Sequence, residues 1–481
     1  MTQRFGLSIP GASTAGGAIE VQAPFDLSPI GEVETADEAG VEQALNNAYG
    51  LFRDRSQWLS LARRIEILEK AALIMAERAD VLAIEAAREG GKPLPDSIVE
   101  VARAIDSVKI CVEHLRTDAG EVIPMSVNAS SANRMAFTQL EPIGVVVAVS
   151  AFNHPLNLIA HQVGPAVACG CPVLVKPART TPLSCFRFVE ILREAGLPEA
   201  WCQVVIPADN KLSTRMVTDS RVAFFSFIGS ARVGWMLRSQ LAPGARCALE
   251  HGGVAPVIAA ADLDMDQAVP ILSKGGFYHA GQVCVSVQRI FAERAIAGEL
   301  AERIAASAKT LKVGDPTLAE TEVGPLITPA EVKRVDEWVR EAQVGGAKLL
   351  SGGKPISETC YSPTVLFDPP ADAKVSTQEV FGPAVCVYPV DGVDEGIARA
   401  NSLPVAFQAA VMTQSIDTAL RCYQGLDAAA VMVNDHTAFR VDWMPFAGLK
   451  SSGHGVGGVP YTMHEMQVRK MMVLRSGEIR R

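Results

Sequence analysis

The sequence predicts an α/β protein in which helices cover largely parallel sheets. Short runs rich in Val and Ile alternate with helix-length runs between residues 144 and 206, and the alternation resumes after residue 255. Such alternation is typical of parallel sheets, because the long connection between two parallel strands usually holds a helix. The length of 481 residues exceeds that of a usual domain, so two or three domains are expected.

Two amphipathic helices are expected before the first strands of this pattern. Apolar residues recur at steps of three and four over residues 65–82, and the run Gly-Gly-Lys-Pro at 90–93 ends that helix. A second series with the same spacing covers residues 98–115. Each helix would bury one stripe against a sheet or another helix.

The strands and helices that follow are expected in a regular order. The strands are short and flanked by Gly or Pro, as in sheets that are buried on both faces. The first domain should contain strands at 144–149, 172–176 and 202–206, separated by helices at 156–168 and 183–195. The second should contain strands at 256–259 and 289–292, followed by a helix at 299–311.

Composition excludes several classes of function. The net charge of −9 without a basic block argues against nucleic-acid binding, because phosphate backbones attract cations. The longest apolar stretch, residues 164–175, is shorter than the roughly 20 residues that span a bilayer. The first residues do not resemble a signal peptide, and the ten cysteines form no C-x-x-C pair. We therefore expect a cytoplasmic protein without membrane partners or a resident metal, in which most cysteines are packing thiols.

One glycine pattern must be set aside. The G-x-G-x-x-G fingerprint occurs at Gly453, Gly455 and Gly458, too near the end of the chain for a βαβ unit to follow. A tight turn is the better interpretation.

Three segments carry residues of chemical interest. The glycine-rich run at 275–284 ends in Cys284, which is either a nucleophile or one more buried thiol. Glu250 precedes two glycines, and it is either a general base or a surface carboxylate. Asn153 precedes Pro155, so its amide either stabilises an oxyanion or caps a helix.

These segments together resemble the aldehyde dehydrogenase superfamily, over residues 20 to 475. The family's G-Q-x-C motif is matched at 281–284 and its E-L-G-G motif at 250–253, where His251 replaces Leu. Its W-N-F-P motif is matched at 152–155, with Phe and His substituted. Its K-P, F-x-G-S and E-x-F-G-P motifs are matched at Lys176-Pro177, 227–230 and 379–383.

The resemblance implies two Rossmann-like parallel-sheet domains and a small β element for oligomerisation. The cofactor-binding domain would comprise residues 1–123 and 142–252, and the catalytic domain residues 253–450. The oligomerisation element would comprise 124–141 and 451–481, with a bridging segment near 121–141 and a C-terminal strand near 467–474. A homodimer or homotetramer is expected.

The resemblance also implies a reaction, the NAD(P)-dependent oxidation of an aldehyde to its acid. Cys284 would attack the aldehyde carbon, while the Asn153 amide and the Cys284 backbone N–H would hold the oxyanion. Glu250 would activate the water that releases a free acid, in contrast to relatives that transfer the acyl group to coenzyme A and lack this glutamate. The cofactor would contact Lys176, Arg179, Gly229, Ser230, Glu379 and Phe381. A binding protein that kept the fold without the chemistry is the remaining alternative.

The choice between NADP and NAD depends on one position. Many NAD-using relatives carry a glutamate three residues after the motif lysine, where this chain has Arg179. A carboxylate there would repel a 2′-phosphate, whereas arginine pairs with it. Arg179 and Lys176 therefore favour NADP, and NAD or dual use is the alternative.

The substrate is expected to be a small aldehyde with a distal anion, such as phosphonoacetaldehyde, sulfolactaldehyde or succinate semialdehyde. His154 and Arg440 are the residues that suggest it, since an imidazole and a guanidinium suit phosphonate, sulfonate or carboxylate. Arg103 is a further candidate, although its place between apolar helix positions favours solvent. Val283 supplies no cation beside the nucleophile. The alternative is a neutral short aldehyde such as lactaldehyde, or an aromatic one.

Overall fold

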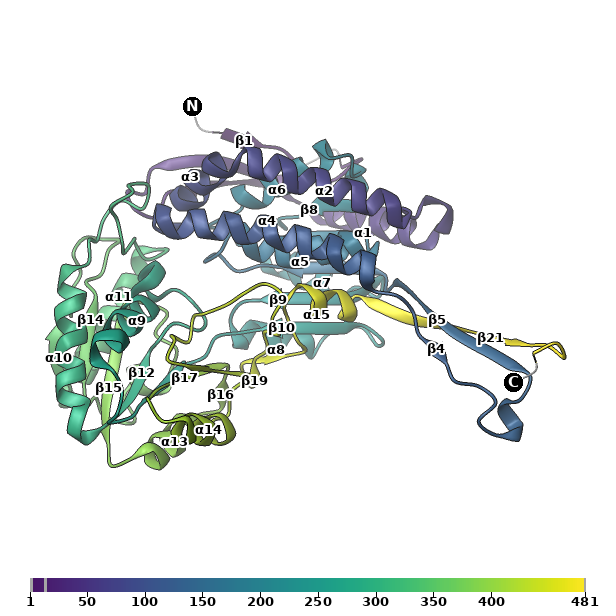
Figure 1. Cartoon of the computed structure of the whole chain (residues 1–481). Coiled ribbons are helices and arrows are strands. Elements are labelled where there is room, and N and C mark those ends of the chain that lie inside the picture. The colour runs from purple at the N-terminus through teal and green to yellow at the C-terminus, as the bar shows by residue number, and fades with distance from the viewer. Residues whose placement is uncertain (1–2, 13–14, 480–481) are drawn as a thin grey trace.

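Two separate sheets organise the chain. The computed structural model describes residues 3–12 and 15–479. The first sheet has six strands in the order β20-β10-β9-β6-β7-β8, all parallel except β20, which is antiparallel to β10 (Figure 1). Its strands are β6 (Val145–Val149), β7 (Val173–Lys176), β8 (Cys202–Val204), β9 (Val222–Ile228), β10 (Arg246–Glu250) and β20 (Gly453–His454).

Helices cover both faces of this sheet. Val146 and Ala148 of β6 pack into one core, and Val145 and Val147 pack into another, so alternate side chains of one strand are buried on opposite sides. This explains why the strands are continuous apolar runs. The first core lies under α2 (Leu61–Glu77), α3 (Ala79–Gly90), α4 (Leu94–Thr117), α5 (Asn157–Cys169) and α6 (Leu183–Glu194), and the second under α1 (Glu38–Arg53) and α7 (Asn210–Thr218).

Two helix predictions need correction. The single helix expected over residues 65–90 is two helices, α2 and α3, which are separated at Arg78 (φ −110°, ψ 15°). The Arg78 guanidinium is 2.8 Å from the Glu194 carboxylate of α6, and Asp80 starts the new first turn. The helix expected from residue 299 begins at Arg294, because β12 (Arg289–Glu293) runs into it without a loop.

The second sheet confirms the second α/β unit. It has seven strands in the order β13-β14-β15-β12-β11-β17-β18, in which only β13 is antiparallel to its neighbour. Its other strands are β11 (Pro256–Ala259), β13 (Lys348–Ser351), β14 (Thr364–Phe367), β15 (Ala384–Val390), β17 (Gln408–Met412) and β18 (Ala430–Val433). The helices around it are α9 (Met265–Phe277), α10 (Arg294–Thr310), α11 (Pro329–Val344), α13 (Val393–Asn401) and α14 (Ile416–Gly425). They share one hydrophobic core with the strands.

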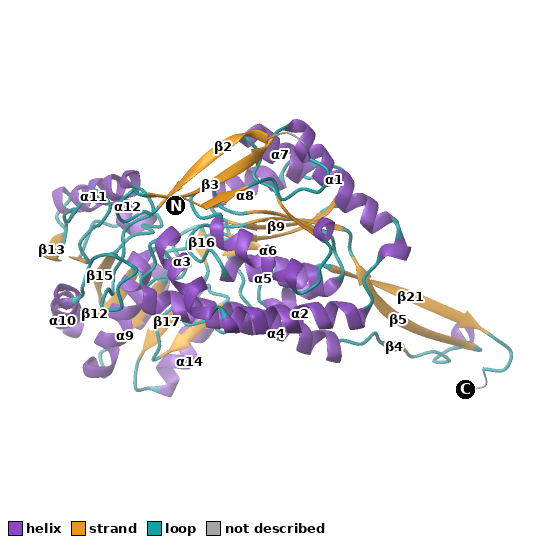
Figure 2. Ribbon diagram, turned by 90° about the horizontal axis from the view of Figure 1, so that it is seen from above, coloured by secondary structure: helices purple, strands orange, loops and turns teal. Residues whose placement is uncertain are grey.

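A long β arm projects from the body of the molecule (Figures 1 and 2). It consists of β5 (Arg134–Pro142) between β4 (Val122–Ile123) and β21 (Gln467–Arg475), and every pair is antiparallel. Only part of residues 451–481 belongs to it. β20 joins the first sheet, and Val459 and Met463 of α15 (Val459–Glu465) pack into the first core. The exact domain boundaries stay a prediction.

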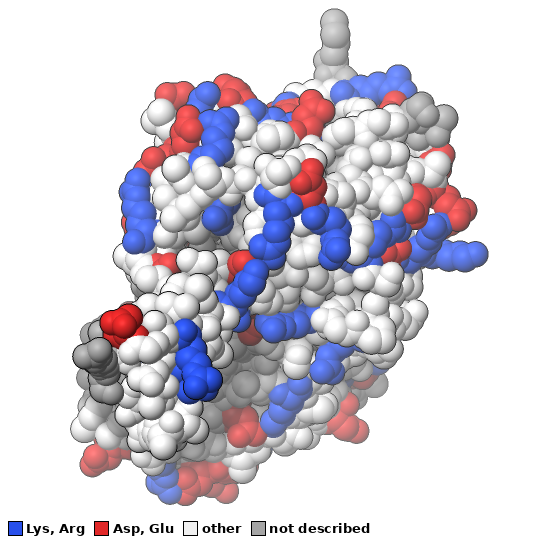
Figure 3. Space-filling model, turned by 90° about the vertical axis from the view of Figure 1, so that its right-hand side faces the viewer, with Lys and Arg blue, Asp and Glu red and all other residues white. Residues whose placement is uncertain are grey.

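The surface carries charges of both signs. On the face that Figure 3 presents, Lys and Arg side chains are interspersed with Asp, Glu and uncharged areas. Within residues 3–12 and 15–479, no helix combines the length and apolar character that crossing a membrane requires. The cytoplasmic location stays a prediction.

Candidate active site

A cavity of about 1080 Å³ lies where the two sheet domains meet. Val149, Lys176, Ile228 and Glu250 line it, and each stands at the carboxyl end of its strand in the first sheet. Ligands of open α/β sheets bind at such ends, where loops leave the sheet. Cys284, on the second domain's side, lines the same cavity, which therefore brings together predicted residues of both halves, with Arg179 as the exception.

A strained turn presents Cys284 to the cavity. His279, Ala280 and Gly281 have positive φ angles of 48°, 52° and 70°. Two non-glycine residues in this conformation carry strain, and such strain is concentrated at functional sites. Gly281 is required for a second reason, because a Cβ there would lie 2.1 Å from the carbonyl oxygen of Gly382.

The Asn153 amide is oriented beside the turn that presents Cys284. Its Nδ2 donates a hydrogen bond of 2.9 Å to the carbonyl oxygen of Gln282, and the residue is only 5% exposed. An amide nitrogen carries two hydrogens, so one fixes its plane and the other is available. Asn153 does not cap α5, because the backbone N–H groups of Leu156 and Asn157 donate to Glu100 instead, at 2.9 and 3.0 Å.

Glu250 lines the cavity at the end of β10 and is not a surface carboxylate. Burial raises the pKa of its carboxyl group, and the Arg440 guanidinium opposes that shift. Gly457 leaves the space that the carboxylate occupies, since a Cβ there would lie 2.0 Å from Oε1. The G-x-G-x-x-G run is thus a turn beside Glu250, with Gly453 paired to Glu250 and a φ of 78° at Gly455.

The electrostatic environment holds the Cys284 thiol neutral in the free protein. Burial raises its pKa to about 12, the carboxylates of Glu379 and Glu250 contribute in the same direction, and Arg440 opposes them. The other cysteines are free thiols without disulfides, and most are buried. Cys284 is therefore the thiol that combines access to the cavity with nearby titratable groups.

The residues predicted to bind the cofactor fall in the other half of the cavity. Burial, with a contribution from Arg179, lowers the pKa of Lys176 to about 8. Arg179 is exposed, lies outside the cavity lining, and donates from Nη1 to the Ala208 carbonyl oxygen at 3.2 Å. Gly229 and Ser230 line the cavity before α8 (Ala231–Arg238).

His251, the residue that replaces the family's leucine, supports this glycine loop. It is 2% exposed, and its Nδ1 lies 2.8 Å from the carbonyl oxygen of Gly229, to which it donates. Its ring fills the space beside Gly234 of α8, where a Cβ would lie 2.1 Å from Cε1. The substitution therefore adds a hydrogen bond between the strand end of Glu250 and the loop at Gly229.

Glu379 and Phe381 complete this half. The Glu379 carboxylate lies against Gly252, where a Cβ would be 1.9 Å from Oε1. Burial raises its pKa to about 8, and among the described residues its Oε1 has no hydrogen-bond partner. Phe381, with a φ of 45°, meets Phe152 edge to face at 5.7 Å.

A chain of polar contacts lines the opposite half. Arg103 donates twice to Asp442, at 2.7 and 3.1 Å, so it does not face solvent; its side chain is 23% exposed and lines the cavity. His161 Nε2 lies 2.6 Å from the same carboxylate, and Arg440 Nη2 lies 3.4 Å from His161 Nδ1. Burial alone would raise the pKa of Asp442, but the hydrogen bonds and charges of His161 and Arg103 hold this pKa well below its usual value. Asp442 and His161 were not predicted from the sequence.

The positive charge of Arg440 is not neutralised by an ion pair with any described residue. Its guanidinium lies 3.6 Å from the centre of the Phe446 ring, and no carboxylate of the described residues is within ion-pair distance. His154 lies beside it in the cavity lining, with Nε2 3.0 Å from the Tyr278 hydroxyl. Burial and nearby cations keep the pKa of His154 well below its usual value, so its ring is neutral.

Comparison with known proteins agrees with this geometry. The sequence matches the aldehyde dehydrogenase family over residues 12–472. It is 36% identical over 473 residues to 3-sulfolactaldehyde dehydrogenase of Priestia aryabhattai, covering 98% of each chain. The fold is similar to aldehyde dehydrogenase 21 of Physcomitrella patens in complex with the reaction product succinate (TM-score 0.94, 31% identity, 100% of both chains).

A second solved structure is also similar. It is glyceraldehyde-3-phosphate dehydrogenase of Methanocaldococcus jannaschii complexed with NADP (TM-score 0.91, 33% identity, 97% of this chain and 100% of that one). The agreement of sequence, fold and site geometry over nearly the whole chain leads to one conclusion. The chain belongs to the aldehyde dehydrogenase family and is an NAD(P)-dependent oxidoreductase.

Proposed function

We propose that this protein oxidises a small aldehyde with a distal anionic group to the free carboxylic acid. One observation carries the proposal: a single cavity contains Cys284, Asn153, Glu250 and an arginine, Arg440, that has no ion pair with a carboxylate of residues 3–12 and 15–479. The first three supply a nucleophile, an oxyanion donor and a base, and the fourth supplies a cation for the substrate.

The reaction begins at Cys284. The neutral thiol first passes its proton to Glu250, which lines the same cavity and releases the proton to solvent before the hydrolytic step. The thiolate then forms a C–S bond to the aldehyde carbon, and the carbonyl oxygen becomes an oxyanion that the second Asn153 hydrogen and the Cys284 N–H stabilise. A nicotinamide held in the cofactor half would accept the hydride that leaves this carbon as the C=O bond re-forms, and Cys284 would then carry the acyl group as a thioester. Glu250 then takes a proton from water, whose oxygen displaces the sulfur and yields the acid.

The residues of the cofactor half fit a dinucleotide. Lys176 is a half-buried cation without a carboxylate partner among the described residues, and the unpartnered Oε1 of Glu379 is an acceptor suited to a ribose hydroxyl. Gly229 and Ser230 line the cavity directly before α8, so the start of this helix adjoins the cavity. Arg179, beside Lys176, favours the 2′-phosphate of NADP, in keeping with the NADP of the Methanocaldococcus relative.

The substrate half supports an anionic group. The relatives act on 3-sulfolactaldehyde or hold succinate, both of which carry an anion besides the oxidised carbon. Neutral His154 and the Tyr278 hydroxyl share one hydrogen bond, so the pair has one further hydrogen that it can donate to such an anion without adding charge. A neutral short aldehyde or an aromatic one is the alternative, since the apolar lining includes Phe439, Phe446 and Val285.

Replacing Arg440 with Met tests the substrate class. Arg440 also opposes the elevated pKa of Cys284, so the variant must be assayed with two aldehydes of equal length, one anionic and one neutral. We expect kcat/KM to fall at least about tenfold further for the anionic aldehyde, which corresponds to roughly 1.4 kcal/mol of binding. An equal loss for both aldehydes would leave Arg440 as a modulator of Cys284 and defeat the anionic assignment, while the aldehyde chemistry itself would stand.

Replacing Glu250 with Gln tests the hydrolytic step. The first turnover should still produce a burst of reduced cofactor, whereas steady-state turnover should fall by about 10²–10⁴-fold. Unchanged steady-state turnover would contradict the role of Glu250. Alkylation of one thiol by iodoacetamide at alkaline pH, where more of the Cys284 thiol is ionised, should be slowed by substrate in an active enzyme, and the Cys284→Ser variant should lose this alkylation.

The cofactor and the assembly are tested separately. Saturation with NADP and with NAD should favour NADP, and Arg179→Gln should raise the KM for NADP while leaving that for NAD unchanged. The arm supports a homodimer or homotetramer, because β21 is an edge strand whose Met471 and Met472 are about half exposed. Light scattering of the full chain would measure the assembly.

A further inference from the structure

A cluster of potential metal ligands lies far from the reaction cavity, at the root of the β arm. It consists of His114 and Asp118 at the end of α4 and His464 of α15. One ligand atom from each residue lies within 4.8 Å of the others. Two imidazoles and a carboxylate are the donor set of many zinc sites with three protein ligands.

The spacing of the two inner residues fits a metal better than a direct contact. His114 Nε2 and Asp118 Oδ2 are 3.5 Å apart, and both are buried without a hydrogen-bond partner among the described residues. Bonds of about 2.0–2.2 Å in a tetrahedral arrangement place two ligand atoms roughly 3.3–3.5 Å apart. An ion between them would satisfy both atoms, each of which is costly to bury alone.

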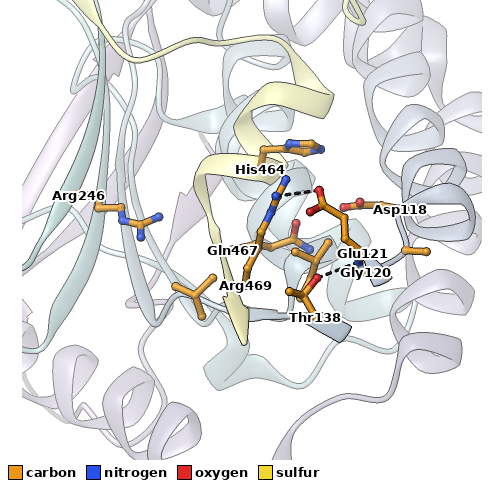
Figure 4. Close-up of a pocket in the computed structure, with 11 residues that line it drawn as sticks. Asp118, Gly120, Glu121, Thr138, Arg246, His464, Gln467 and Arg469 are labelled. Carbon is orange, nitrogen blue, oxygen red and sulfur yellow. Dashed lines mark hydrogen bonds and ion pairs between the residues drawn. The ribbon is translucent and has the colours of Figure 1, made fainter. Parts of the chain in front are cut away.

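The third residue and the surroundings leave room to complete the coordination. The His464 ring is exposed, and its centre lies 5.1 Å from that of His114, so a small rotation brings its nitrogen into range. Asp118 and His464 line a pocket of about 410 Å³, in which Glu121 is bound to Arg469 at 2.9 Å (Figure 4). A water from this pocket can occupy the fourth position.

Two arginines, Arg246 and Arg469, line the same pocket. The guanidinium of Arg469 points toward the Glu121 carboxylate and forms an ion pair with it, which offsets the positive charge of this arginine. Cys169, whose thiol is close to Asp118, bonds to the Met463 carbonyl at 3.4 Å.

We infer that His114, Asp118 and His464 form a binding site for a divalent transition metal of the zinc class, which joins α4 to α15. The consequence is structural. α4 leads through Asp118 toward β4, and α15 leads directly into β21, so one ion ties together the roots of the arm's strands. Metal bound to the folded chain alone would raise its stability.

Titration of the full chain, without a histidine tag, with Zn²⁺ and with Co²⁺ tests this inference. We expect one saturable site per chain, and a Co²⁺ absorption spectrum typical of nitrogen and oxygen ligands. His464→Gln should weaken Zn²⁺ affinity more than about 100-fold, since loss of an outer-shell partner alone costs about 10–100-fold. Because His464 is exposed, this variant should fold normally, and His454→Gln, another exposed histidine, is the matched control.

Two further measurements identify the site. Zn²⁺ should raise the thermal midpoint of the wild type and of His454→Gln but not that of His464→Gln or Asp118→Asn. Binding that survives His464→Gln and disappears in Cys284→Ser would assign the metal to the catalytic thiol and overturn the inference. Absence of saturable binding to the wild type would also overturn it, and would leave the cluster as a stacked histidine pair beside an aspartate.

Discussion

Replacing Glu100 with Gln removes the counter-charge from a lysine that has no contact with solvent. Glu100 and Lys92 form an ion pair in which both side chains are 0% exposed. The other carboxylate oxygen accepts from the N–H groups of Leu156 and Asn157, at the start of α5. The pair therefore holds the segment that begins with Asn153.

The magnitude follows from this environment. Gln has the shape of Glu and keeps one carbonyl acceptor, but its amide cannot neutralise the Lys92 ammonium. Removing one partner of a buried pair costs about 3–5 kcal/mol, so the free energy of unfolding should fall by that amount. A displacement of Asn153 should also lower the burst rate, because a misplacement of about 1 Å can cost roughly 100-fold.

The loss of stability should depend on pH. Burial lowers the pKa of Lys92 from the usual 10.5, and Glu100 opposes that shift. Without Glu100 the folded-state pKa falls further, so the unfolded chain binds more protons than the folded chain over a wider range. Stability then rises with pH in that range. The difference in the free energy of unfolding between the wild type and Glu100→Gln should be largest at lower pH. It should shrink as the pH rises and Lys92 loses its proton.

Urea unfolding followed by tryptophan fluorescence at several pH values measures the stability, and stopped-flow detection of reduced cofactor measures the burst. Glu69→Gln is the matched control, since it removes the exposed ion pair with Arg116 and should cost about 1 kcal/mol or less. A Lys92→Met/Glu100→Gln double variant should regain stability. The reasoning is refuted if Glu100→Gln is as stable as the control at every pH.

Other expectations concern the active site itself. Asn153→Ala should lower the rate of the burst by about 10²–10³-fold, or roughly 2.7–4 kcal/mol, and an unchanged burst would remove it from the oxyanion site. Alkylation of Cys284 in the free protein should keep accelerating as the pH rises through neutrality, because the pKa of this thiol is raised to about 12. Arg440→Met should slow the alkylation at a given pH, since Arg440 lowers this pKa. A plateau of the alkylation rate near neutral pH would contradict this expectation. His251→Leu should raise the KM for the cofactor roughly 2- to 13-fold, the worth of a hydrogen bond of about 0.5–1.5 kcal/mol to the Gly229 carbonyl, with little change in kcat.

The sequence by itself determined the fold class and the family, and it led to the proposal of the reacting residues. The strands and helices between 144 and 206 occur as expected, because alternation of apolar runs is a local property of the chain. Cys284, Glu250 and Asn153 could be proposed because each stands in a short motif. The break at Arg78 escaped prediction, because a continuous apolar stripe does not reveal that two successive helices pack in different directions.

Only the tertiary structure decided how the site is supported and charged. His161 and Asp442 are 281 residues apart in the chain, and Glu100 reaches α5 from a position 56 residues upstream. No local pattern links such residues, so their partnership appears only when the chain is folded. The same holds for Arg103, which the helix pattern directed to solvent and which the fold pairs with Asp442. The sequence thus specified the chemistry through short motifs, whereas long-range packing set the burial, the hydrogen bonds and the pKa values on which that chemistry depends.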